Sequence, residues 1–119
     1  MFDLTLNYCL SFPGVTREEK WDDDLRFFVG EKLFCMISKT PPHRISFKCT
    51  PRDFHQLICR PGIVPAPYLA RYHWVQLKQF DQLPLTELQD LLQQAYDLAV
   101  SSLPPEEQEQ VLKERLKNV

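Results

Sequence analysis

The sequence predicts a single α+β domain spanning residues 1–119, and three observations predict it. A length of 119 residues, with 44% hydrophobic and 25% charged residues, is typical of one compact globular domain. The middle of the chain carries short runs of aromatic and β-branched residues bounded by glycine and proline, which is typical of strands. From Pro84 onward, apolar residues recur at helical spacing.

Residues 2–12 fit two patterns. Their apolar side chains alternate as in a strand, and some of them also form a helical stripe through Phe2, Leu6 and Cys9. Asp3 can cap a helix, and Pro13-Gly14 ends either element. We favour the helix.

Four strands are predicted in the middle of the chain. In the third, Ile45, Phe47 and Cys49 face one side and polar residues face the other, which describes a sheet covered on one face only. Gly30-Glu31 is the expected turn between the first two strands. The predicted strands are residues 25–29, 32–38, 44–49 and 73–78.

Three further helices are predicted. Thr50 can cap a short one that has Pro51 at its first position and Asp53 in its first turn, and residues 60–62 end it. The proline-rich loop, residues 61–72, follows. After Pro84 a long helix carries its apolar stripe through Ala99, and the final helix, residues 106–117, begins acidic and ends basic, as the helix dipole favours.

The formal net charge of −2 hides a segregated distribution. Residues 1–25 carry two basic and six acidic side chains. Residues 26–78 carry nine basic and two acidic side chains, and residues 79–119 carry three basic and eight acidic ones. A basic block between acidic ends indicates a face for a polyanion such as nucleic acid, or ends that fold over the middle and neutralise it. Both interpretations remain open from the sequence.

No catalytic or metal-binding motif is found. The three glycines are far apart, and the three histidines and four cysteines show no metal-ligand spacing. We therefore expect a non-catalytic protein without cofactor or metal. Isolated cysteines in apolar surroundings favour buried thiols in a reducing cytoplasm. No apolar run approaches the roughly 20 residues of a membrane span, and no signal-peptide pattern is seen, so we expect a cytoplasmic protein with no membrane contact.

The acidic run Asp22-Asp23-Asp24, with Glu18 and Glu19 nearby, has two interpretations. It is either a solvated turn between the first helix and the sheet or a site for a hard cation. Because no ordered spacing of oxygen ligands is visible, we favour the turn.

The predicted outward face of the sheet combines cations with aromatic and hydrogen-bonding residues. Strand alternation directs Ser46 and Gln76 away from the core, together with their charged neighbours. Cations hold phosphates and aromatic rings stack on bases, so we predict nucleic-acid binding, with Trp74 as the stacking residue. The candidate contact residues are Arg26, Lys39, Arg44, Lys48, Arg71, His73, Trp74 and Lys78.

Other interpretations of these residues remain open. Cations on strands are also the usual way to solvate a sheet, and Trp74 can instead pack under the proline-rich loop. That loop, with His73-Trp74 beside it, is the candidate surface for a protein partner, and a small-ligand pocket beneath it is a third hypothesis.

A series of stretches spread over nearly the whole chain carries a resemblance to a known family: residues 12–16, 32–35, 44–51, 61–66, Tyr68-Leu69, His73-Trp74, Leu83-Pro84 and residues 101–104. On these stretches the chain resembles the MmcQ/YjbR-like family of small bacterial proteins, whose fold is related to that of CyaY, the bacterial frataxin. The resemblance implies a two-layer α+β domain with a curved antiparallel sheet packed against helices. It also implies DNA binding through a proposed double-wing arrangement, and it supplies no catalytic residues.

Overall fold

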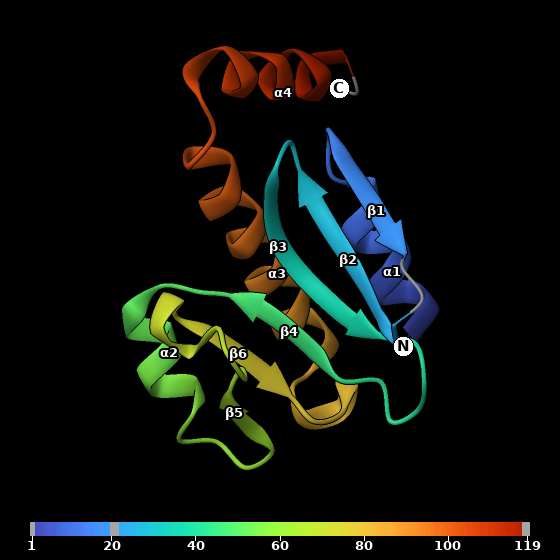
Figure 1. Ribbon diagram of the computed structural model, residues 1–119, viewed down its shortest axis with the longest axis vertical. Helices are drawn as coiled ribbons and strands as arrows, with labels where there is room; N and C mark the ends of the chain where they lie inside the picture. The colour runs from blue at the N-terminus through green and yellow to red at the C-terminus, as the bar shows by residue number, and fades with distance from the viewer. Residues whose placement is uncertain (1, 20–21, 118–119) are drawn as a thin grey trace.

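The computed structural model describes residues 2–19 and 22–117, in which six strands form one curved antiparallel sheet (Figure 1). The strand order is β1-β2-β3-β4-β6-β5, and every neighbouring pair is antiparallel. The α+β class and the curved sheet packed against helices are confirmed. The strands are β1 (Val15–Glu19), β2 (Asp24–Val29), β3 (Lys32–Ser38), β4 (Ile45–Lys48), β5 (Ile63–Pro65) and β6 (Trp74–Leu77).

Two helices, α1 (Phe2–Ser11) and α3 (Leu85–Ser101), cover one face of this sheet, which we call the inner face (Figure 1). The helix favoured for the first segment is therefore confirmed. Strand side chains such as Phe47 and Val75 are fully buried in one core cluster with Leu92 and Tyr96 of α3. The Tyr96 hydroxyl donates a hydrogen bond to the carbonyl oxygen of Pro13 at 2.5 Å, which ties α3 to the turn after α1.

The short helix α2 (Pro51–Leu57) joins β4 to β5 and begins as the sequence predicts. The Oγ1 atom of Thr50 accepts a hydrogen bond from the Asp53 amide at 3.1 Å, and Pro51 occupies the first turn. Two 3₁₀ helices follow in the chain, η1 (Ala70–Tyr72) before β6 and η2 (Phe80–Gln82) after it.

The last helix, α4 (Pro105–Lys117), crosses one end of the sheet (Figure 1). α4 packs on the turn between α1 and β1, and Leu103, which precedes α4, packs on the turn between β2 and β3. Gly30 of the second turn has a φ of +58°, which favours glycine, and a Cβ there would lie 2.9 Å from the side chain of Leu103, which would have to shift.

The structure adds two strands that the sequence does not predict, and they are the two edges of the sheet. β1 contains three charged residues and no apolar alternation, and none of its side chains is buried. β5 has only three residues, one of them Pro65, whose missing N–H is tolerated on an edge. An edge strand is buried less than a central one, so it lacks the alternation that identifies a strand in sequence.

Candidate functional site

The floor of the candidate site is a row of side chains on the outer face of the sheet, which is the face turned away from α1 and α3. The strand register aligns Gln76 of β6 with Ser46 of β4, and Ser46 with Met36 of β3. Met36 is in turn aligned with Arg26 of β2. The Nε2 atom of Gln76 donates a hydrogen bond to Ser46 Oγ at 3.3 Å, so the floor presents hydrogen-bonding groups.

Residues 66–69 of the proline-rich loop form a wall beside this floor. The Ala66 amide donates to the Trp74 carbonyl at 3.0 Å, and the Leu69 amide donates to the Ala66 carbonyl at 3.1 Å. The loop is thus anchored to β6, with Ala66 buried. At its tip, Tyr68 is 98% exposed and has a left-handed backbone with a φ of +67°, which is rare for a bulky residue.

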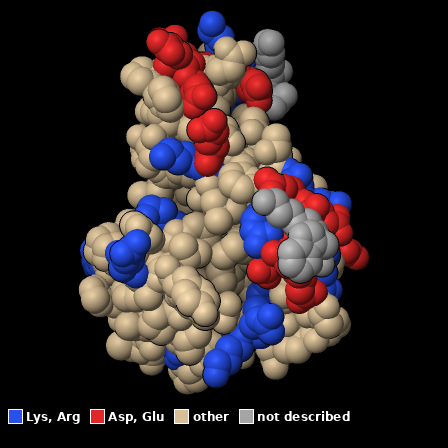
Figure 2. Space-filling model, in the orientation of Figure 1, with Lys and Arg blue, Asp and Glu red and all other residues tan. Residues whose placement is uncertain are grey.

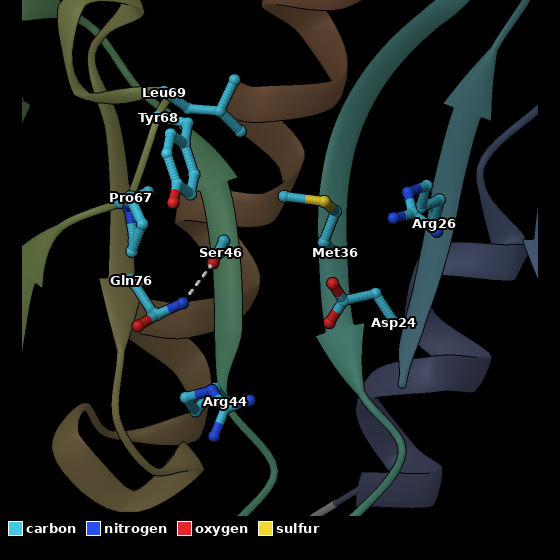
Figure 3. A pocket seen from close by; sticks show the side chains of 10 residues that line it. Asp24, Arg26, Met36, Arg44, Ser46, Pro67, Tyr68, Leu69 and Gln76 are labelled. Carbon is cyan, nitrogen blue, oxygen red and sulfur yellow. Dashed lines mark hydrogen bonds between the residues drawn. The ribbon is translucent and has the colours of Figure 1, made fainter. Parts of the chain in front are cut away.

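Floor and loop enclose a groove of about 440 Å³, which we call the open-face groove (Figure 3). Figure 3 shows Tyr68 and Leu69 at one end and Arg44 at the other, with Asp24 and Arg26 on the β2 side and Pro67 on the β6 side. The volume lies within the range of small-ligand sites. The lining residues are Asp24, Arg26, Met36, Arg44, Ser46, Ala66, Pro67, Tyr68, Leu69 and Gln76.

Charge on the β2 side of the groove is compensated. Arg26 donates to both carboxylate oxygens of Asp22, at 2.8 and 3.1 Å, and these hydrogen bonds lower the pKa of the Asp22 carboxyl. Asp24 adds a second carboxylate that lines the groove itself. This side therefore attracts a phosphate weakly.

Cations without a carboxylate partner lie at the Arg44 end. The register Ile45↔Leu77, continued by one residue, places Arg44 beside Lys78, and both side chains are exposed. Within the described residues, the hydrogen bonds of Arg44 and Lys78 are made by their backbones, and neither side chain forms an ion pair or a hydrogen bond. This end of the groove has the stronger attraction for an anion.

A second hollow of about 300 Å³, the side hollow, lies on the other side of Leu69. Lys48 lines it and donates from Nζ to the Tyr72 carbonyl at 2.9 Å. Trp74 also lines it and is only 5% exposed, which disfavours the stacking role expected from the sequence and favours the alternative of packing under the loop. Alternation correctly places Trp74 away from the inner face, where it shares the side hollow with Leu69 and Tyr72 of the loop. The side hollow is lined by Lys32, Leu33, Lys48, Leu69, Tyr72, Trp74, Ala99 and Ser102.

The other predicted contact residues line neither hollow. Lys39 lies 3.5 Å from a carboxylate oxygen of Glu19 on β1. Arg71 places its guanidinium 4.8 Å from the ring centre of Tyr72. His73 contacts other residues of the protein. Its ring packs edge-on against Phe54, and its carbonyl accepts hydrogen bonds from the amide and thiol of Cys49.

The basic block of the sequence does not become one continuous positive surface on this face. Figure 2 shows Lys and Arg side chains as separate groups divided by uncharged surface. Carboxylates gather along the β1–β2 edge and on α4. The groove therefore owes its character to a few local cations and to its shape rather than to a strong overall field.

Sequence reasoning missed three of the residues that shape the groove. Met36 lies in an almost wholly apolar strand, in which no alternation shows which side chain faces outward. Asp24 was assigned to the acidic turn, but it begins β2. Tyr68 belongs to a loop whose path over the sheet depends on tertiary contacts, and nothing in the local sequence shows its left-handed backbone.

No metal-binding cluster of histidine, cysteine and acidic residues is found in residues 2–19 and 22–117. Part of the acidic run binds protein groups: Asp22 holds Arg26, and Asp23 accepts a hydrogen bond from the Thr40 hydroxyl at 2.6 Å. In the same described ranges, no helix combines the length and apolar character that a membrane crossing requires.

These features define a class of protein: an α+β domain with one sheet face covered by helices and a ligand-sized groove on the other. The chain belongs to the YjbR family, whose family model matches residues 10–98. The family expected from the sequence is confirmed. The match ends within α3, so α4 lies outside it.

Solved structures share the fold. A crystal structure of the Deinococcus radiodurans protein DR2400, described with the domain DUF419, superposes with a TM-score of 0.83 at 23% identity, covering 93% of this chain and 87% of that one. A protein from Pseudomonas syringae superposes with a TM-score of 0.68 at 18% identity, covering 82% of this chain and 97% of that one. Among curated proteins, no match is found.

Proposed function

We propose that the protein binds DNA through the outer face of the sheet and catalyses no reaction on it. The observation that carries this proposal is a pair of cation groups at the two ends of a hydrogen-bonding floor. Arg44 and Lys78 lie at one end, and Lys48 and Arg71 lie toward the other. Within the described residues, none of the four is ion-paired with a carboxylate. Cations in this arrangement can hold successive phosphates of one backbone.

The spacing supports a backbone that runs along β4. Arg44 and Lys48 are four residues apart, which is about 13 Å in a strand. Between them lie Ser46 and its neighbour Gln76, whose polar groups can contact bases. The double wing implied by the family resemblance would correspond to two exposed segments beside this face, the turn at Pro41-Pro42 and the loop carrying Tyr68.

Salt dependence tests the proposal quantitatively. Neutralising about four phosphates gives a slope of log K against log salt of about −3.6 for a duplex and about −2.8 for a single strand. Replacing Arg44 and Lys78 together by alanine should halve that slope and weaken binding. Fluorescence anisotropy of a labelled 20-nucleotide DNA, titrated from low to moderate salt, measures both quantities.

A matched control removes the same charge elsewhere. Arg17 is ion-paired with Glu19 on the edge strand β1, and Lys113 lies on α4. The Arg17→Ala/Lys113→Ala variant should keep the wild-type slope. The absence of binding at low salt, or equal slopes for the two double variants, would show that this face does not hold DNA.

The loop itself favours a second candidate, which is contact with a protein partner. Tyr68 is 98% exposed and Tyr72 48% exposed, and exposed aromatic residues on an anchored loop are frequent interface anchors. A partner captured from nuclease-treated extract by the wild type and by the Arg44→Ala/Lys78→Ala variant, but lost on Tyr68→Ser, would favour this candidate.

A further inference from the structure

We propose that the open-face groove accepts one unpaired base of a single-stranded DNA segment, with the ring of Tyr68 stacked on the base and the groove floor hydrogen-bonded to its edge. This inference rests on the proposed function and narrows it from DNA in general to the single strand. Three features of the groove carry it: the presentation of Tyr68, the polar groups of the floor, and the distribution of charge across the sheet.

Tyr68 is presented as a platform rather than packed as a core residue. Its side chain is 98% exposed, and yet the backbone that carries it is anchored on both sides by the hydrogen bonds of Ala66 and Leu69. Figure 3 shows its ring at one end of the groove, with its hydroxyl on the side of Gln76 and Ser46 in this view. Aromatic rings held in this manner stack on any base, since every base has a π-face.

The floor supplies both donors and acceptors. Gln76 uses one N–H of its amide on Ser46, which leaves the second N–H and the carbonyl oxygen for a ligand. The Ser46 hydroxyl accepts that bond and keeps its own proton to donate. Met36 completes the floor with a flexible apolar thioether beside the polar pair. A neighbouring donor and acceptor match the hydrogen-bonding edge of a base, and an unpaired base can offer its Watson–Crick edge to them.

Charge across the sheet disfavours the second strand of a duplex. If one sugar-phosphate backbone of a DNA duplex lies at Arg44, the other backbone, across the major groove of the DNA, would lie about 12 Å away. Neighbouring strands are about 4.8 Å apart, so this distance extends from β4 to the β2–β1 edge. Asp24 begins β2 and lines this side of the groove with a carboxylate that repels phosphate, while Arg26 is already paired with Asp22 and so attracts a second backbone weakly. Toward β5, the loop carrying Tyr68 occupies the space above the sheet.

The test compares one DNA sequence in two forms. A fluorescein-labelled 12-nucleotide strand and its duplex are titrated with wild-type protein, and a second strand carries a single 2-aminopurine, whose fluorescence falls when it stacks. We expect tighter binding of the single strand, together with quenching of the base analogue. Tyr68→Ser should weaken single-strand binding by about 5- to 150-fold and abolish quenching, whereas Tyr68→Phe should retain both.

Controls separate this inference from the proposed function. Tyr72→Ser removes the other exposed tyrosine of the loop, which does not line the groove, and should bind as the wild type does. Equal binding of strand and duplex, or binding and quenching unchanged in Tyr68→Ser, would overturn the inference and leave DNA binding standing. Failure of both DNA forms to bind at low salt would overturn the proposed function and the inference with it.

Discussion

The same strands place different kinds of side chain on the two faces of the sheet. On the inner face, Ile45 and Phe47 of β4 are fully buried beneath the helices. On the outer face, Ser46 of the same strand is hydrogen-bonded in a groove, and the preceding Arg44 is exposed. A strand alternates its side chains between faces, so one four-residue segment contributes to the stability of the core and to the candidate site. The comparison indicates that the two roles can be changed separately.

The largest effect is expected from the inner face. Phe47→Ala removes a fully buried ring from the core and should lower the free energy of unfolding by about 3–5 kcal/mol. Arg44→Ala, three residues earlier and exposed, should change it by less than about 0.5 kcal/mol. Urea unfolding followed by circular dichroism measures both. A similar loss in the two variants would show that the faces are not energetically separate.

A smaller effect is expected from the hydrogen bond that joins α3 to the turn after α1. The fully buried Tyr96 donates its hydroxyl proton to the Pro13 carbonyl, so Tyr96→Phe leaves that carbonyl without its partner and should destabilise the fold by about 1–2 kcal/mol. Tyr72→Phe makes the same chemical change on the exposed loop and should be neutral. Equal unfolding midpoints for Tyr96→Phe and the wild type would mean that this hydrogen bond does not contribute to stability.

The sequence was most informative where a strand or helix has one buried side. The alternation in residues 44–49 and 73–78 gave the correct inward residues, and the periodic stripe after Pro84 identified α3. The capping residues Thr50 and Pro51 gave the start of α2. The missed strands β1 and β5 are edges, where pairing is set by neighbouring strands rather than by a local apolar pattern.

The candidate site was predicted less completely, for a related reason. Alternation placed Arg26, Ser46 and Gln76 in one row on the outer face, and the structure confirms that row. It could not show which loop residue is exposed and which strand residue is covered, so it offered Trp74 as the stacking residue and gave Tyr68 no separate role. In the structure Tyr68 is exposed, whereas Trp74 is buried and lines the side hollow together with Leu69 and Tyr72 of the loop. Tertiary packing of a loop on a sheet leaves no periodic signal.

The smallest expected effect on stability tests whether the left-handed backbone at the exposed Tyr68 lowers the free energy of unfolding. A left-handed backbone conformation destabilises a bulky residue by about 1–2 kcal/mol. Glycine adopts this conformation without strain, but it lowers the free energy of unfolding by about 0.5–1 kcal/mol, because it gives the unfolded chain more conformational entropy. Tyr68→Gly should therefore raise the free energy of unfolding by up to about 1 kcal/mol while it removes single-strand binding. Tyr72 has no left-handed backbone, so Tyr72→Gly should destabilise the fold instead. If both exchanges shifted stability in the same direction, the backbone of Tyr68 would not be strained, and the outer face would differ from the inner face only in what covers it.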